Sequence, residues 1–232
     1  MRAVPYTWDV PVCPYDAVIF DFDGVLINSE PIFLAATNAV FAREGRVLSA
    51  EAASIYNGLR LREMLMELIP LLDLTHDVDF YIRESRIEEA RLFSAPMEPP
   101  PGAAALLRQL DELAVPRAVG SSSDHAWVDR MLTHLGIRQH LPIIVGGDQV
   151  PAAKPAPDIL LRCAELLDVQ PARCLVIEDS IYGVLAAHRA GMTTLGFPMY
   201  SNANLKFSGC CAIAWSFQEV ADHLGISISP PS

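Results

Sequence analysis

Short apolar segments alternate with longer amphipathic segments along most of this chain of 232 residues. The first apolar segment is residues 17–20, and it ends at Asp21-Phe22-Asp23-Gly24. A continuous apolar run that stops at a glycine is typical of a buried strand in a parallel sheet. The predicted strands are residues 17–20, 117–120, 143–146, 174–177 and 193–197, and the predicted helices between them are residues 103–113, 127–135, 158–167 and 183–190.

One long stretch breaks this alternation. From about residue 31 to residue 93 the apolar residues have helical spacing, and no segment has the pattern of a strand. Prolines stand at both edges of the stretch, and such crossings are typical of linkers between domains. We therefore predict an α/β fold with a doubly wound parallel-sheet core of residues 14–29 and 96–225 and an all-helical domain of residues 30–95 inserted after the first strand.

Charge and hydropathy narrow the range of partners. The chain has 17 basic and 28 acidic residues, a formal net charge of −11, and 51% apolar residues. This balance excludes nucleic acid or an anionic membrane as the main partner, because both require a clustered positive surface. No apolar run approaches the roughly 20 residues of a membrane span, and the N-terminus lacks the basic-then-apolar pattern of a signal peptide. We expect a soluble monomer.

Cysteine and histidine add no metal site. The five cysteines include no C-x-x-C pair, and none has metal-ligand spacing with a histidine. An odd number of cysteines in a chain of this size is typical of reduced thiols, which predicts a cytoplasmic location. The six histidines are scattered, and we assign none of them a catalytic role.

Polar residues follow four of the predicted strands. Ligands of open α/β sheets bind outside the carboxyl ends of the strands, so these residues are expected to converge at one edge. Clustered carboxylates repel one another unless a hard cation lies among them, and oxygen ligands suit Mg²⁺. The residues are Asp21 and Asp23 after the first strand, Ser121-Ser122-Ser123 after the second, Lys154 on the loop after the third, and Glu178-Asp179 after the fourth.

This set of groups is suited to phosphoryl transfer. With a cation bound, a phosphate dianion can approach the acidic site, and the lysine and a serine hydroxyl can hold its oxygens. One carboxylate can attack phosphorus to form an aspartyl phosphate. A second carboxylate can protonate the departing oxygen and later activate water.

The motifs Asp21-Phe22-Asp23-Gly24-Val25, Ser121, Lys154 and Glu178-Asp179, in that order, resemble those of the haloacid dehalogenase-like hydrolase superfamily. The helical insert resembles the cap of its phosphatase and β-phosphoglucomutase-like branch. The resemblance implies a Rossmann-like core with an all-α cap. It also implies these roles: Asp21 as nucleophile, Asp23 as general acid/base, Ser121, Ser122 and Lys154 as phosphate ligands, and Mg²⁺ held by Asp21, the backbone carbonyl of Asp23, Asp179 and, through water, Glu178.

Residues 57–62 lie between two predicted cap helices, where relatives place a substrate-specificity loop. Gly58 permits a close backbone approach, and Arg60 or Arg62 can reach a hydroxyl, a carboxylate or a second phosphate of a substrate. The alternative is that the two arginines are solvated residues at a helix start.

Four functions compete. The leading hypothesis is a Mg²⁺-dependent phosphatase that hydrolyses a small phosphorylated metabolite, and a sugar phosphate is the favoured substrate class. The nearest alternative is a β-phosphoglucomutase-like isomerase, but Phe33 stands where that type carries a histidine that helps to control the acid/base aspartate. A signalling phosphoacceptor domain is disfavoured, because such domains are about half as long as this chain and lack the helical insert. An inactive binding protein is disfavoured because no motif residue is missing.

Overall fold

The computed structural model describes residues 14–93, 97–200 and 209–228. Within them, a six-stranded parallel sheet has the strand order β3-β2-β1-β4-β5-β6, which confirms the predicted fold class. The first five strands match the predicted ones to within one residue at each end, and the two-residue strand β6 was not predicted. The strands are β1 (Ala17–Phe20), β2 (Arg117–Gly120), β3 (Ile143–Val145), β4 (Cys174–Glu178), β5 (Thr193–Gly196) and β6 (Ala212–Ile213).

Both faces of the sheet are covered, which explains why the strands are continuously apolar. Val18 and Phe20 pack into one apolar cluster, whereas Ala17 and Ile19 pack into a second cluster on the opposite face. Successive side chains of a strand point to opposite faces, so β1 stabilises both layers. The first layer contains α5 (Ala103–Glu112), α6 (His125–His134) and α9 (Phe217–His223), and the second contains α7 (Asp158–Leu167) and α8 (Ile181–Arg189).

Two helix starts are set by side chains that cap them. The Ser180 hydroxyl accepts a hydrogen bond of 3.0 Å from the Gly183 amide, so α8 begins two residues before the predicted helix. Ser216 likewise accepts a bond of 3.2 Å from the Glu219 amide at the start of α9. Such caps satisfy amides that the first helical turn leaves free.

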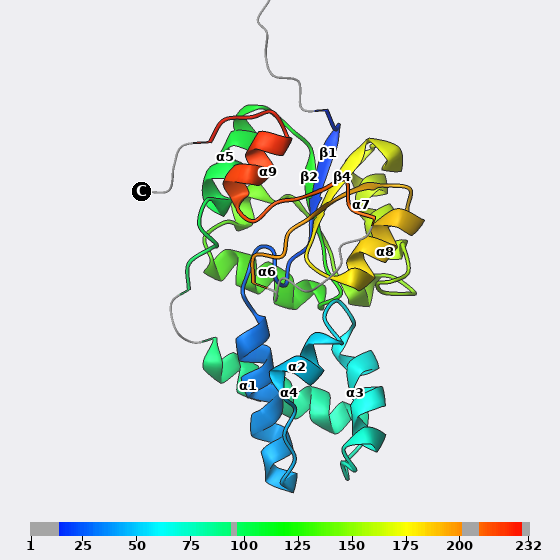
Figure 1. The fold of residues 1–232 in the computed structure, drawn as a ribbon. Helices are drawn as coiled ribbons and strands as arrows, with labels where there is room; N and C mark the ends of the chain where they lie inside the picture. The colour runs from blue at the N-terminus through cyan, green and yellow to red at the C-terminus, as the bar shows by residue number, and fades with distance from the viewer. Residues whose placement is uncertain (1–13, 94–96, 201–208, 229–232) are drawn as a thin grey trace, which may run out of the picture.

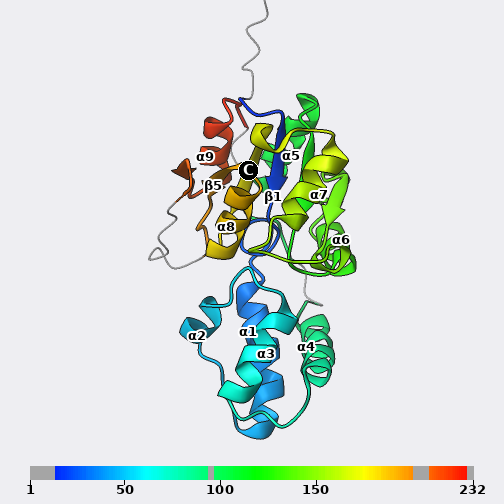
Figure 2. The ribbon, with the colours of Figure 1, turned by 90° about the vertical axis from the view of Figure 1, so that its right-hand side faces the viewer.

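Residues 30–92 form a separate group of helices beyond the end of the sheet at which β1 ends (Figures 1 and 2). Its apolar centre includes Phe41 and Tyr81, whose rings meet edge to face at 5.7 Å. The cap boundaries at residues 29/30 and 95/96 stay a prediction, and Pro96 lies outside the described residues. The helices are α1 (Glu30–Phe41), α2 (Ala50–Ser54), α3 (Leu61–Leu71) and α4 (Val78–Leu92).

Short 3₁₀ turns complete the connections at residues 42–44, 138–140, 147–149 and 171–173. Among the helices of the described residues, none has the length and apolar character needed to cross a membrane.

Candidate active site

Three carboxylates meet at the carboxyl ends of the two central strands. Asp21 directly follows β1, Glu178 is the last residue of β4, and Asp179 comes next. The two strands are paired in parallel, with Phe20 beside Ile177, so they deliver their following residues to the same place. All three carboxylates are buried. One oxygen atom from each carboxylate can be chosen so that the three atoms all lie within 4.8 Å of one another.

Lys154 supplies the positive charge inside this cluster. It lies on the loop between β3 and α7, and its side chain is 1% exposed. Its Nζ donates hydrogen bonds of 2.7 Å to Asp21 Oδ1 and 2.8 Å to Glu178 Oε2. Burial by itself lowers the pKa of Lys154, but the Asp21 and Glu178 carboxylates raise it above its ordinary value overall. The lysine therefore stays charged.

One ammonium group does not balance three buried carboxylates. The pKa of Asp21 is raised to about 8, chiefly by burial and then by the Glu178 charge, against the lowering effect of Lys154. Burial, followed by the charges of Glu178 and Asp21, also raises the pKa of Asp179 well above its ordinary value. The remaining negative charge must be neutralised by protons or by a bound cation.

The cluster fits a divalent cation. Carboxylate oxygens are the ligands that Mg²⁺ prefers in proteins. Gly24 makes room for one of them, because a Cβ at this position would overlap the Asp179 carboxylate, and its φ of +82° is a conformation that glycine adopts readily. The acidic triad Asp21, Glu178 and Asp179 could therefore bind a metal ion.

Glu178 is also held from its other side. Its Oε1 accepts hydrogen bonds of 3.1 Å from the Ser180 amide and 2.6 Å from the Ser180 hydroxyl, while its Oε2 binds Lys154. A Cβ at Gly183 would overlap this carboxylate. Glu178 therefore reaches the cluster in one fixed orientation, and both of its oxygens already have partners.

Serine hydroxyls orient the second aspartate of the first motif. Asp23 Oδ1 accepts a hydrogen bond of 2.6 Å from Ser29, and Oδ2 accepts one of 2.8 Å from Ser123 and a longer one of 3.4 Å from Ser121. The Ser121 hydroxyl in turn accepts a bond of 3.0 Å from the Ser123 amide. Asp23 is thus tied to the loop after β2 and to the residue before α1.

No individual role was predicted for Ser29 or Ser123. Ser29 occupies the N-cap position of α1, where a serine is ordinarily a helix cap, but its side chain makes no capping bond and donates to Asp23 instead. Ser123 is the last of three consecutive serines, and spacing alone does not show which of the three faces Asp23. Ser121, which was predicted to bind phosphate, is fully buried beside Asp23.

Cap residues make direct contacts with the core. The Ser122 hydroxyl, expected to bind phosphate, donates a bond of 2.7 Å to the Gly58 carbonyl. Arg60 donates from one nitrogen to the carbonyls of Gly147 and Val150, the latter at 3.1 Å. Gly58 and Arg60 therefore join the cap to the loops after β2 and β3.

Arg62, the other arginine of the predicted specificity loop, has a different environment. It forms an ion pair of 2.5 Å with Asp79 of α4, and both side chains are more than half exposed. Arg62 therefore matches the alternative prediction, a solvated arginine at a helix start.

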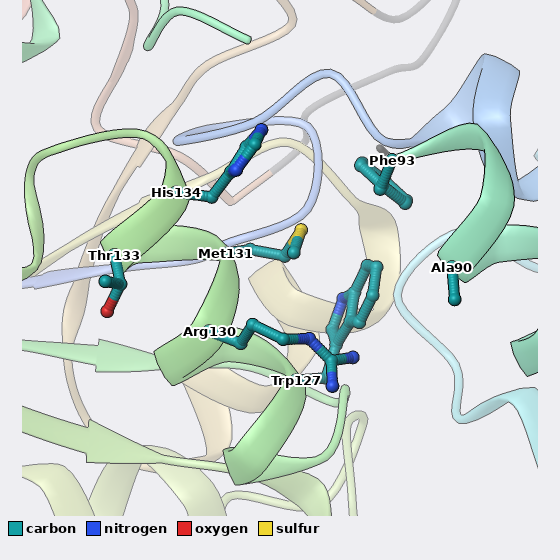
Figure 3. Close-up of a pocket in the computed structure, with 7 residues that line it drawn as sticks. All are labelled: Ala90, Phe93, Trp127, Arg130, Met131, Thr133 and His134. Atoms are coloured by element: carbon teal, nitrogen blue, oxygen red, sulfur yellow. The ribbon is translucent and has the colours of Figure 1, made fainter. Parts of the chain in front are cut away.

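A cavity of about 550 Å³ lies elsewhere at the junction of cap and core (Figure 3). The Arg130 guanidinium lies 5.1 Å from the centre of the Trp127 ring beside it. None of the predicted site residues lines this cavity, so we assign it no part in the chemistry. Its lining residues are Ala90, Phe93, Trp127, Arg130, Met131, Thr133 and His134.

A helical cap over a doubly wound core, with clustered carboxylates and a lysine at the strand ends, is an architecture suited to enzymes that act on phosphate esters. The family model of the haloacid dehalogenase-like hydrolases matches residues 18–197, and the chain belongs to this family. The matched residues begin in β1 and end just after β5, so they include all four motifs.

Several relatives of this chain are phosphatases. The fructose-1-phosphate phosphatase YqaB of Escherichia coli (strain K12) is 32% identical over 178 residues, which cover 77% of this chain and 94% of that protein. A phosphorylated carbohydrates phosphatase of Thermotoga maritima is 31% identical, over 76% of this chain and 82% of that protein. The enzyme class expected from the sequence, a haloacid dehalogenase-like phosphatase, is confirmed.

A solved structure of another family member has a similar fold. The crystal structure of a family hydrolase from Deinococcus radiodurans R1, with bound phosphate and sodium, is 28% identical and has a TM-score of 0.73. The similarity covers 94% of this chain and 100% of that one.

Proposed function

We propose that this protein is a Mg²⁺-dependent phosphatase that hydrolyses a small phosphorylated metabolite, a sugar phosphate, through an aspartyl phosphate on Asp21. The observation that carries the proposal is the placement of Asp21 beside Lys154, with Asp23 held nearby by Ser29 and Ser123. The sugar phosphatases among the relatives support the substrate class. A cytoplasmic location and a monomeric state stay predictions.

Two steps account for hydrolysis. In the first, an oxygen of Asp21 forms a bond to phosphorus while the bond from phosphorus to the leaving oxygen breaks, and Asp23 gives that oxygen a proton. In the second, Asp23 takes a proton from water as the water oxygen attacks phosphorus, and the Asp21 carboxylate is restored. Lys154 and Ser121 hold the phosphoryl oxygens in both steps.

The metal site belongs to the same proposal. Asp21, Asp179 and the backbone carbonyl of Asp23 would hold Mg²⁺, with Glu178 acting through water. When bound, the cation supplies positive charge that lets a phosphate dianion enter and that stabilises the transferring group. The raised pKa values of Asp21 and Asp179 in the cation-free protein support this assignment.

We expect Mg²⁺ affinity to increase with pH between pH 6 and pH 8. Asp21, with a pKa of about 8, carries a proton over most of this range in the cation-free protein, and a metal must displace that proton. The affinity therefore increases by up to about tenfold per pH unit for each proton displaced. Titration calorimetry at several pH values measures this.

Asp179→Asn is expected to weaken Mg²⁺ binding, whereas Asp16→Asn is its matched control because Asp16 lies in an exposed ion pair with Arg173. Full turnover in excess EDTA, or an affinity independent of pH, contradicts the assignment.

The test of the proposed function is the fate of the phosphoryl group. With a hexose phosphate and Mg²⁺, we expect steady release of free phosphate without a bisphosphate activator. Phe33 packs against the apolar centre of the cap, and an apolar ring cannot hydrogen-bond Asp23. The hydrogen bonds to Asp23 come from serine hydroxyls instead, and no side chain at position 33 withholds Asp23 from water. Labelled phosphate that moves between two positions of one sugar faster than it is released would establish the isomerase instead.

A further inference from the structure

Glu89 of α4 is a buried carboxylate with one oxygen unpaired. Its side chain is 2% exposed, and its Oε2 accepts a bond of 2.7 Å from Arg86 one turn earlier. Its Oε1 is buried without a hydrogen-bond partner among the described residues. A buried acceptor that lacks a donor costs stability, so such a group in a native protein calls for an explanation.

The surroundings of Glu89 link it to the catalytic aspartates. Arg86 also contacts the core, where it lies 3.3 Å from Asp124 and 5.6 Å over the Trp127 ring. Asp124 directly follows Ser123, whose hydroxyl holds Asp23. Burial raises the pKa of Glu89 against the effect of Arg86, and the charge of Asp23 adds to that rise. Arg86 therefore connects Glu89 to the loop after β2, and Ser123 of that loop holds Asp23.

We propose that Glu89 is a specificity residue whose free oxygen accepts a hydrogen bond from a hydroxyl of the substrate's leaving group. Arg86 orients Glu89 and does not contact the substrate. The substrates are then phosphate monoesters of neutral polyhydroxy compounds, and esters that carry a second phosphate or a carboxylate are rejected. This inference rests on the proposed phosphatase function.

The chemistry of the Glu89 carboxylate supports rejection of a second anion. An ionised carboxylate accepts hydrogen bonds but donates none, so it suits hydroxyls and repels anions. Arg86 is shared between the Glu89 and Asp124 carboxylates, and the Arg130 guanidinium lies over the same Trp127 ring as Arg86 does. Arg62, one of the two cap arginines that were expected to reach a substrate, is paired with Asp79 instead.

The experiment compares kcat/KM for a hexose monophosphate, the corresponding bisphosphate, phosphoglycolate and an aryl phosphate without hydroxyls. In the unaltered protein, we expect kcat/KM for the hexose monophosphate to exceed that for the bisphosphate and that for phosphoglycolate by about tenfold or more. Glu89→Gln should lower kcat/KM for the hexose monophosphate about tenfold more than for the aryl phosphate, through KM, and should narrow the preference over the bisphosphate.

Glu88→Gln is the matched control. Glu88 is the preceding glutamate of α4, but it pairs with Arg43 and Arg91 on the outside of the cap, so all substrate ratios should stay as in the unaltered protein. Glu89→Asp keeps the charge and shortens the reach, so it should raise KM for the hexose monophosphate while it keeps the discrimination against anions. This second variant decides the question if Glu89→Gln does not fold.

Unaltered ratios in a folded Glu89 variant overturn this inference, and so does a protein that turns over phosphoglycolate or the bisphosphate best. Both results leave the phosphatase function intact. A protein that releases phosphate from none of the four esters refutes the proposed function itself.

Discussion

Asp21→Asn is expected to lower kcat by about 10⁴-fold or more, because an amide oxygen is a far poorer nucleophile than a carboxylate and nothing else in the proposed mechanism replaces it. Phosphate release from an aryl phosphate measures the loss. A beryllium fluoride adduct, which mimics an aspartyl phosphate, should form on the unaltered protein at Asp21 and should not form on the variant.

The fold of the Asp21→Asn variant should survive. Three buried carboxylates share one lysine, so removing one charge relieves repulsion and leaves the 2.8 Å bond between Lys154 and Glu178 in place. We expect the melting temperature of the cation-free variant at pH 8 to equal or exceed that of the unaltered protein. Asp16→Asn, on the surface, should keep full activity. Substantial turnover by Asp21→Asn, or an adduct on another residue, would refute the assignment of the nucleophile.

Lys154→Met is expected to remove both activity and stability. The variant loses a phosphate ligand, and it also leaves Asp21, Glu178 and Asp179 buried without a compensating positive charge. Removing one partner of a buried ion pair costs about 3–5 kcal/mol of unfolding free energy. Urea denaturation at pH 8 in EDTA measures this loss.

The pH dependence of the Lys154→Met defect follows from the neighbouring carboxylates. The pKa values of Asp21 and Asp179 are raised even with Lys154 present, so at lower pH these groups take up protons and the uncompensated charge decreases. The destabilisation should therefore be smaller at pH 6 than at pH 8, and Mg²⁺ should restore part of the loss. Arg173→Met breaks only an exposed pair with Asp16 and should cost about 0–1 kcal/mol. A Lys154→Met protein as stable as that control contradicts the charge balance described for this site.

Local patterns were sufficient to predict the core. Residues 17–20 are apolar at every position because both faces of β1 are covered, and a run of this kind is visible in sequence without knowledge of its neighbours. The strand β6 was missed because two residues are too few to show the hydrophobic pattern of a strand. It is a strand because it pairs with β5. The first residues of α8 were missed because Ser180, three residues before Gly183, was not recognised as the cap.

The order of strands and motifs in the sequence was enough to predict that Asp21, Lys154, Glu178 and Asp179 meet, because parallel strands place the residues that follow them at one edge of the sheet. The other side chains around this cluster could not be predicted from the sequence. Ser29 and Ser123 donate hydrogen bonds to Asp23, the second aspartate of the first motif, from two distant parts of the chain. These contacts depend on where loops and helices from distant parts of the chain come together.

The same holds for the cap. A stripe of apolar residues predicts that α4 buries one face, but it does not show what that face meets. The helix presents Glu89 toward the core and Glu88 toward Arg43, a difference of one residue that follows from the 100° rotation between successive helical positions. Sequence periodicity defines the faces of such a helix, and only the packing of α4 against α1 and the core decides which of the two glutamates is buried.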